Sequence, residues 1–253
     1  MWLKDLPGQT AVRFGSLFWT PKEIGRVLAQ TVRPFILETT DPLPLVGRVG
    51  TTTLVSHQGS KYAVATRHQL SVNGGVNLTE EDVDAVRIGA KEGGRLINLP
   101  VNKCVFETGN PDEAFHELVF FCVDEKFPQV SRDSYYFANL SKIDSGKYLK
   151  SVAYGLPHLN EQVDYDNSHL KIHIQEIWCE YDANFKTHNR NFRKLNIINP
   201  EGKFYDGMSG GAVFSFYRHQ KEFLVLLDGV IVRAGNGQIY IVDTEYLEQM
   251  FGA

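Results

Sequence analysis

Cysteine is scarce in this 253-residue sequence, and the few that occur do not pair by spacing. Cys104, Cys122 and Cys179 are far apart, and each lies in an apolar or strand-like stretch with no Cys-x-x-Cys motif. An odd number of scattered cysteines is not the pattern of a disulfide-stapled secreted domain. We therefore expect buried free thiols in a reducing, cytoplasmic environment.

Long hydrophobic runs and a strong excess of one charge are also missing. No apolar run approaches the ~18 residues of a membrane-spanning helix, and the start MWLKD lacks the apolar core and cleavage site of a signal peptide. A net charge of −4 gives no sign of a bulk nucleic-acid binder. We expect neither a membrane nor a nucleic acid as partner.

Short strand-like stretches separated by turn residues dominate the chain after its first ~40 residues. Strands of this length and spacing favour barrels or a sandwich, so the fold class is mostly β. The expected strands are Val46–Ser56, Lys61–Ala65, Val86–Ile88, Arg95–Glu107, Leu118–Val123, Tyr148–Tyr154, Leu170–Tyr181, Phe192–Ile198, Gly211–Phe216, Phe223–Val232 and Gln238–Val242.

Two helices are expected outside these strands. Thr20-Pro21-Lys22-Glu23 has an N-cap residue followed by proline, which predicts a short amphipathic helix through about Thr31. Thr244–Phe251 reads as a closing helix capped by Thr244. The polar stretch from Lys126 to Lys147 could connect two β halves. We expect an N-terminal extension over residues 1–40, a first β-barrel over 41–130, and a second β-barrel with the C-terminal helix over 131–253.

The stretch DGMSGGAVFS, residues 206–215, surrounds one serine with three glycines. Acyl transfer by serine needs backbone N–H donors for the developing oxyanion, and a glycine-rich turn can present them. The amides of Gly207 and Ser209 are the natural pair. The same letters also fit a tight turn before a strand, or the nucleophile elbow of α/β hydrolases.

The α/β-hydrolase alternative fails on chain order. Those enzymes place the acid and the histidine after the serine. Here the only later histidine is His219, in a polar turn, and no strand/helix alternation is present. A histidine upstream of Ser209 fits better, and His68 is the strongest candidate because it closes the apolar strand Tyr62–Ala65. A strand end holds an imidazole more rigidly than a loop does.

Four segments together resemble trypsin-like serine peptidases of the chymotrypsin fold, over roughly Val46 to Val242. The resemblance implies two six-stranded antiparallel β-barrels, a polypeptide substrate, Ser209 as nucleophile and His68 as general base. It also places Gly229, Val230 and Ile231 on the strand beside the substrate. The segments are GRVGTTTLVSHQGSKYAVATRH, VAYGLP, DGMSGGAVFS and LLDGVIVRA.

The family's acid is an aspartate just ahead of a run of small and apolar residues. The matching run here is LVFFCV, which puts Glu117 at the acid position. Asp112 and Glu113 are close in sequence and could serve instead. A further alternative is that Glu117 is a solvated residue at a strand start and that Ser209 and His68 work as a dyad.

Two positions near the serine bear on control and specificity. Met208 stands where secreted trypsin-like enzymes carry the aspartate that pairs with a freed amino terminus, so the protein looks more like the intracellular bacterial type. Activity would then depend on a partner or on the N-terminal extension. Lys203 lies near the position of the specificity pocket, where a cation would favour an acidic side chain, although a solvated lysine in the turn Glu201-Gly202-Lys203 is the simpler explanation.

The sequence therefore predicts a serine endopeptidase with the triad Ser209, His68 and Glu117. A catalytically silent barrel that serves as a binding module, and an esterase with the same triad, remain alternatives. We expect no cofactor and no metal, because His169 and His173 lie in a strand-like stretch without a third ligand. The basic run KTHNRNFRK reads as a solvated loop.

Overall fold

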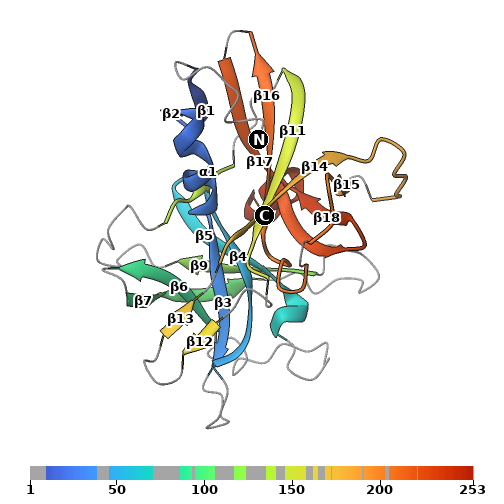
Figure 1. Ribbon diagram of the computed structural model, residues 1–253. Coiled ribbons are helices and arrows are strands. Elements are labelled where there is room, and N and C mark those ends of the chain that lie inside the picture. The colour runs from blue at the N-terminus through green and yellow to red at the C-terminus, as the bar shows by residue number, and fades with distance from the viewer. Residues whose placement is uncertain are drawn as a thin grey trace.

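The computed structural model describes residues 10–38, 46–70, 86–92, 95–105, 117–123, 135–140, 146–157, 162–164, 169–171, 173–189, 191–202, 205–220 and 222–252. It is mostly β, with two curved sheets forming two lobes, one above the other in the view of Figure 1.

The upper lobe is a closed antiparallel barrel. Its strand order is β16-β11-β14-β15-β18-β17, and the pairing of β16 with β17 closes the ring. A short parallel strand, β1 (Val12–Phe14), adds to β17 and continues into β2 (Leu17–Trp19). The barrel strands are β11 (Lys147–Gly155), β14 (Gln175–Tyr181), β15 (Phe192–Ile197), β16 (Ala212–His219), β17 (Glu222–Gly235) and β18 (Gln238–Asp243).

The lower lobe is a half-barrel, in the order β7-β6-β3-β4-β5-β9-β8, with β10 (Ala138–Asn139) alongside β4. β7 and β8 lie at the two ends of this path although only Pro100 separates them in sequence, so one bent run of chain reaches both edges. Proline cannot donate to a strand ladder, which explains why the single strand expected over Arg95–Glu107 is broken there. The strands are β3 (Val32–Glu38), β4 (Val46–His57), β5 (Ser60–Thr66), β6 (Val86–Glu92), β7 (Arg95–Leu99), β8 (Val101–Val105) and β9 (Leu118–Val123).

Residues 10–38 contribute strands to both lobes, which sequence reasoning did not predict. β1 and β2 join the upper barrel, and β3 pairs with β4 and β6 in the half-barrel. Strands of three residues leave too little pattern to detect, and Pro34 within β3 argues against a strand. The division of the chain at residues 40 and 130 stays a prediction.

Two local features follow the sequence signals closely, and a third departs from them. The turn Gln58-Gly59 has positive φ at both residues, as a two-residue hairpin requires, and joins β4 to β5. Helix α1 (Pro21–Ala29) begins after Thr20, whose hydroxyl donates to Glu23 at 2.8 Å. The expected Leu170–Tyr181 strand is divided between β13 (His169–Lys171), which pairs with β12 (Gln162–Asp164), and β14.

The closing helix α3 (Thr244–Gly252) forms as expected, but its cap is a different residue. Asp243, not Thr244, accepts the backbone N–H of Tyr246 through its carboxylate at 3.2 Å. Aspartate is a strong N-cap because its carboxylate satisfies a free amide of the first turn. Neither α1 nor α3, nor any other helix among the described residues, is long and apolar enough to cross a membrane.

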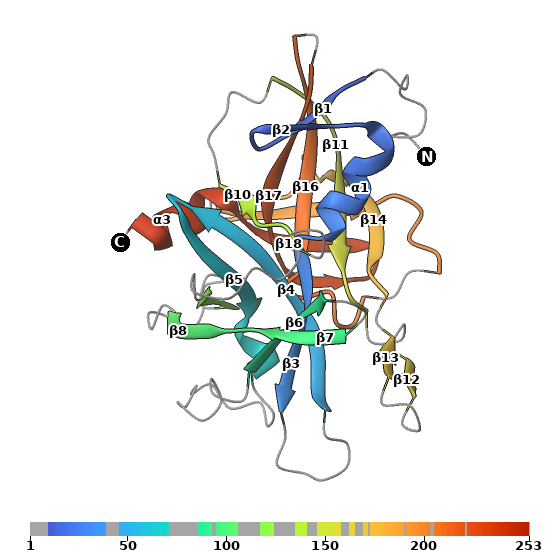
Figure 2. The same ribbon diagram turned by 90° about the vertical axis from the view of Figure 1, so that its left-hand side faces the viewer.

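The largest apolar cluster lies between the two lobes rather than inside either one. It includes Val55 and Phe120 of the half-barrel together with Phe14 and Phe214 of the upper barrel, all nearly or fully buried. Helix α3 adds a bridge: the Phe251 ring stacks on Tyr62 of β5, with 4.0 Å between the ring centroids. Figure 2 shows α3 beside the ends of β4 and β5. Apolar contact therefore holds the lobes together.

Replacing Phe251 with alanine should loosen this bridge. Loss of the stacked ring is expected to lower the free energy of unfolding by about 2 kcal/mol, measured by urea denaturation. Phe18 is the matched control, because its ring is 57% exposed on β2, and Phe18→Ala should change stability by no more than ~0.5 kcal/mol. Equal effects of the two substitutions would show that α3 does not bind the lobes.

Candidate active site

His68 lies in a single 3-10 turn, η2 (Arg67–Leu70), that follows β5 directly. The turn is shaped by Gln69, whose side-chain oxygen accepts the backbone N–H of Thr66 at 2.9 Å. Gln69 is 6% exposed, so this bond is shielded from water. The buried end of β5 therefore fixes the point from which His68 projects.

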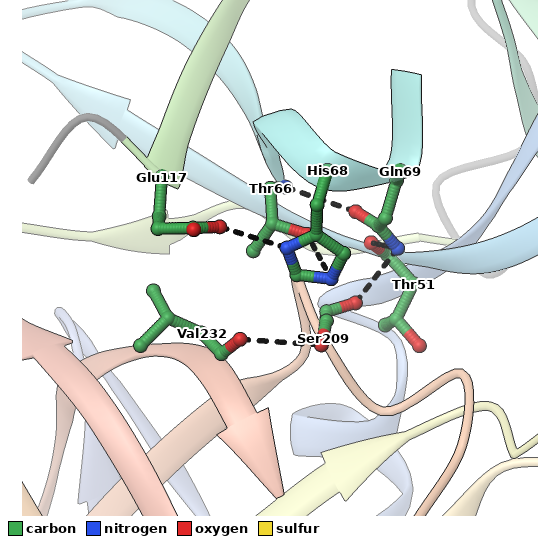
Figure 3. Close-up of polar contacts among 7 residues, drawn as sticks. All are labelled: Thr51, Thr66, His68, Gln69, Glu117, Ser209 and Val232. Atoms are coloured by element: carbon green, nitrogen blue, oxygen red, sulfur yellow. Dashed lines mark hydrogen bonds and ion pairs between the residues drawn. The ribbon is translucent and has the colours of Figure 1, made fainter. Parts of the chain in front are cut away.

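A carboxylate lies against the imidazole of His68. The Nδ1 atom of His68 is 2.8 Å from Oε2 of Glu117, and Figure 3 marks this contact by a dashed line. Leu118, which follows Glu117, pairs with Thr66, so the β5–β9 register brings this carboxylate to the histidine. Both side chains are more than 40% exposed. An exposed pair of this kind contributes little to stability, so its main effect is to orient the ring.

The contact with Glu117 also selects the tautomer of His68. A carboxylate accepts hydrogen bonds, so the neutral imidazole carries its proton on Nδ1 and presents an unprotonated Nε2. The hydroxyl of Thr66 lies 3.3 Å from Nε2 and can donate to it. Asp112 and Glu113, the other candidate acids, lie outside the described residues.

The serine loop is a tight turn that requires glycine. Gly207 and Gly210 have φ values of +91° and +82°, and Gly211 N–H donates to the Met208 carbonyl at 2.9 Å. A Cβ at Gly210 would lie 1.9 Å from the carbonyl oxygen of Thr51 in β4. No side chain fits in that space, so the glycine lets the serine loop approach the half-barrel.

Two amides of this loop have no acceptor among the described residues. Met208 N–H donates to Tyr205 at 3.0 Å and Gly210 N–H to Ile231 at 2.7 Å, while Gly211 N–H closes the turn. Within the described part of the chain, no acceptor is bonded to the amides of Gly207 or Ser209. These are the two donors that the sequence offers for an oxyanion, and that role stays a prediction.

The carbonyl groups of the same loop point toward the half-barrel. Thr51 donates its hydroxyl to the Gly207 carbonyl at 2.7 Å, and Thr53 donates to the Gly210 carbonyl at 2.7 Å. Gln69 donates its side-chain amide to the Ser209 carbonyl at 2.9 Å. Side chains of one lobe thus satisfy three carbonyls of the other.

Met208, where a secreted enzyme would carry aspartate, is fully buried. It belongs to an apolar cluster with Val213 and Ile231, and a Cβ at Gly155 would lie 2.6 Å from its sulfur. The residue beside the serine is therefore held by apolar packing and not by an ion pair.

Ser209 and His68 face one another without a hydrogen bond between them. The Ser209 hydroxyl donates instead to the Val232 carbonyl, over a long 3.3 Å, while Nε2 of His68 faces Thr66. Figure 3 shows Ser209 below the imidazole ring. Rotation about the Cα–Cβ bond of Ser209 would release its hydroxyl from Val232.

β17, the strand that the sequence resemblance places beside the substrate, is paired with other barrel strands over most of its length. Gly229 pairs with Val213 on one side and Asp243 on the other, and Val230 and Ile231 are fully buried. The ladder with β18 shifts between Ile231 and Arg233, and the residue released there is Val232. Sequence reasoning missed Val232 because a register shift leaves no sequence signal. Lys203 lies outside the described residues.

Other candidate features have structural explanations. The basic run forms ion pairs, Arg193 with Asp243 and Lys194 with Asp182, each at 2.9 Å. Among the described residues, no three histidine, cysteine or acidic side chains group as a metal site would require.

A buried carboxylate inside the barrel also lacks any sequence signal. Asp228 accepts the hydroxyls of Ser215 and Tyr181, and burial raises the pKa of this carboxyl above its ordinary value. The Ser215 hydroxyl also bonds Ser151 at 2.7 Å, so these groups form one buried polar network.

No protein-family model matches this chain, and no curated protein matches it. Among solved structures, 416 chains match. One is the protease AniSEP from Arthrobacter nicotinovorans, with a TM-score of 0.51 and 12% sequence identity, covering 89% of this chain and 95% of that chain. At this identity the likeness shows the fold alone. It confirms the chymotrypsin-like fold, here as a closed barrel with a half-barrel, and the chain shares that fold with a protease.

Gly210→Ala should destabilise the protein by more than the backbone strain of a positive φ would cost by itself. The added Cβ meets the Thr51 carbonyl, so we expect a loss of about 3 kcal/mol or more in unfolding free energy. Gly59→Ala is the matched control, because Gly59 has a similar φ of +90° with nothing within 4 Å, and it should cost only about 1 kcal/mol. Urea denaturation of both variants measures the difference. Equal losses would contradict a tight approach at Gly210.

Proposed function

We propose that this protein is a serine endopeptidase in which Ser209 is the nucleophile, His68 the general base and Glu117 the orienting acid. The observation that carries the proposal is the 2.8 Å contact between His68 Nδ1 and Glu117. Beside it lies a serine loop in which the amides of Gly207 and Ser209 have no acceptor among the described residues. A carboxylate, an imidazole and a serine in this order are the parts of a nucleophilic acyl-transfer site.

The reaction begins when Ser209 turns its hydroxyl from the Val232 carbonyl to Nε2 of His68. Nε2 takes the hydroxyl proton as the serine oxygen attacks the carbonyl carbon of a peptide bond. The amides of Gly207 and Ser209 stabilise the resulting oxyanion. His68 then protonates the leaving amine, an acyl-enzyme remains on Ser209, and water activated by His68 releases it.

Control of the site is part of the same proposal. The Ser209 hydroxyl rests on Val232 and the His68 Nε2 faces Thr66, so an activating step must bring these two groups together. Met208 is buried among apolar side chains, so the residue that precedes the serine supplies no charged switch. We propose that a protein partner or the N-terminal extension shifts the serine to its reactive rotamer. The protein then acts on polypeptides in the cytoplasm.

A catalytically silent binding module is the second candidate. The absence of a Ser209–His68 hydrogen bond favours it. An esterase with the same triad is separated from a peptidase by comparing matched ester and amide substrates.

A fluorophosphonate probe tests the nucleophile directly. The probe should label the wild-type protein on Ser209, and both Ser209→Ala and His68→Ala should abolish labelling, because the first removes the attacking oxygen and the second its base. Labelling is followed by intact-protein mass spectrometry, alone and with candidate partners. A wild-type protein that stays unlabelled under all these conditions would favour the silent module.

Glu117→Gln tests the acid. The amide carries no charge to stabilise the imidazolium, and its NH2 group can donate to Nδ1 and so favour the wrong tautomer. The labelling rate and kcat should therefore fall by roughly a hundredfold or more. Glu180→Gln, on the exposed side of β14, is the control and should leave both rates unchanged. Unchanged rates in Glu117→Gln would show that Glu117 is not the acid that orients His68. Asp112→Asn and Glu113→Gln would then be the next variants to measure.

A further inference from the structure

We propose that Gln69 is the positioning residue that sets the separation between His68 and Ser209. This inference rests on the proposed peptidase function and adds a residue that no catalytic motif assigns. The two reacting side chains come from different lobes, and Gln69 joins them through one buried side chain.

The carboxamide of Gln69 uses both of its ends. Its oxygen accepts Thr66 N–H at 2.9 Å, and its nitrogen donates to the Ser209 carbonyl at 2.9 Å and to the Thr51 carbonyl at 3.2 Å. The side chain is 6% exposed. Figure 3 shows it extending from the turn that carries His68 to the backbone of Ser209.

The chemistry of the three partners requires a carboxamide of this length. Thr66 offers a donor, while Ser209 and Thr51 offer acceptors, and an amide is the side-chain group that has an acceptor oxygen beside two N–H donors. A glutamate would bring an acceptor against two carbonyls, and an asparagine is one methylene too short. Gly50 leaves room for the Gln69 carboxamide, because a Cβ at Gly50 would lie 2.0 Å from the Gln69 side-chain nitrogen.

Gln69 differs from the other two side chains that hold the serine loop. Thr51 and Thr53 bond the carbonyls on either side of Ser209, but neither lies next to the base. Gln69 follows His68 in the same turn and bonds the nucleophile's own carbonyl. Any movement of the η2 turn is therefore passed to Ser209. A misplacement of about 1 Å between reacting groups can cost roughly a hundredfold in rate.

The experiment compares Gln69→Met with Thr53→Val. Methionine keeps the length and fills the space but makes none of the three bonds. Thr53→Val is the matched control, because it removes a buried bond of 2.7 Å to the adjacent Gly210 carbonyl. We expect Gln69→Met to lower kcat and the fluorophosphonate labelling rate by about 30- to 100-fold with KM within about threefold. Thr53→Val should lose less than about fivefold.

Urea denaturation of the same two variants separates positioning from stability. If the loss of activity follows the loss of stability in both, Gln69 acts only as a structural link and the proposal is overturned. Gln69→Asn is the conservative variant: with the amide retained but too short, it should behave like methionine. Full activity in Gln69→Asn would also overturn the proposal.

Crystal structures of the two variants give a readout that needs no activity. In Gln69→Met the Cα atoms of His68 and Ser209 should move apart by more than about 0.5 Å, the tolerance of a productive site. In Thr53→Val their separation should be unchanged. If the wild-type protein is neither labelled nor active, the peptidase proposal fails, and this separation still decides the positioning role. An unchanged separation in Gln69→Met would overturn it.

Discussion

Hydrogen bonds between the lobes fix how the serine loop of the upper barrel lies against the half-barrel. They are accepted by three backbone carbonyls of the serine loop. Those of Gly207, Ser209 and Gly210 would each be costly to bury unpaired, and each is satisfied by a side chain of the half-barrel. The pairing works in both directions, because Thr51 also accepts the N–H of Leu156 at 2.9 Å. The docked half-barrel therefore completes the hydrogen bonding of the serine loop.

Stability and site geometry come from different interactions. The apolar cluster between the lobes, with Phe14, Phe120 and Phe214, buries surface without specifying angles. The polar links above it are directional, so they select one docked geometry among those that apolar contact allows. The His68–Glu117 pair is too exposed to contribute much stability, and its effect is confined to the orientation of one ring.

The sequence predicted what depends on local pattern. Strand-like stretches between turn residues marked most strands, and the glycines around Ser209 marked a tight turn. What it missed depends on contacts distant in sequence. Gln69 reads as an ordinary polar residue until a carbonyl 140 positions away is found beside it. The Val232 carbonyl can accept the Ser209 hydroxyl because the β17–β18 pairing shifts next to it. The short strands β1 and β2 form because β1 pairs with β17 and β2 pairs with β1.

Met208 gives the serine loop a thermodynamic character of its own. The stability of a loop held by an ion pair depends on pH and on ionic strength. The Met208 thioether is instead buried among Val213 and Ile231, so its contribution depends on how water hydrates apolar surface. Apolar burial weakens on cooling and strengthens in the presence of excluded solutes such as sulfate or sucrose. The order of the loop next to the nucleophile is therefore tied to temperature and osmotic conditions.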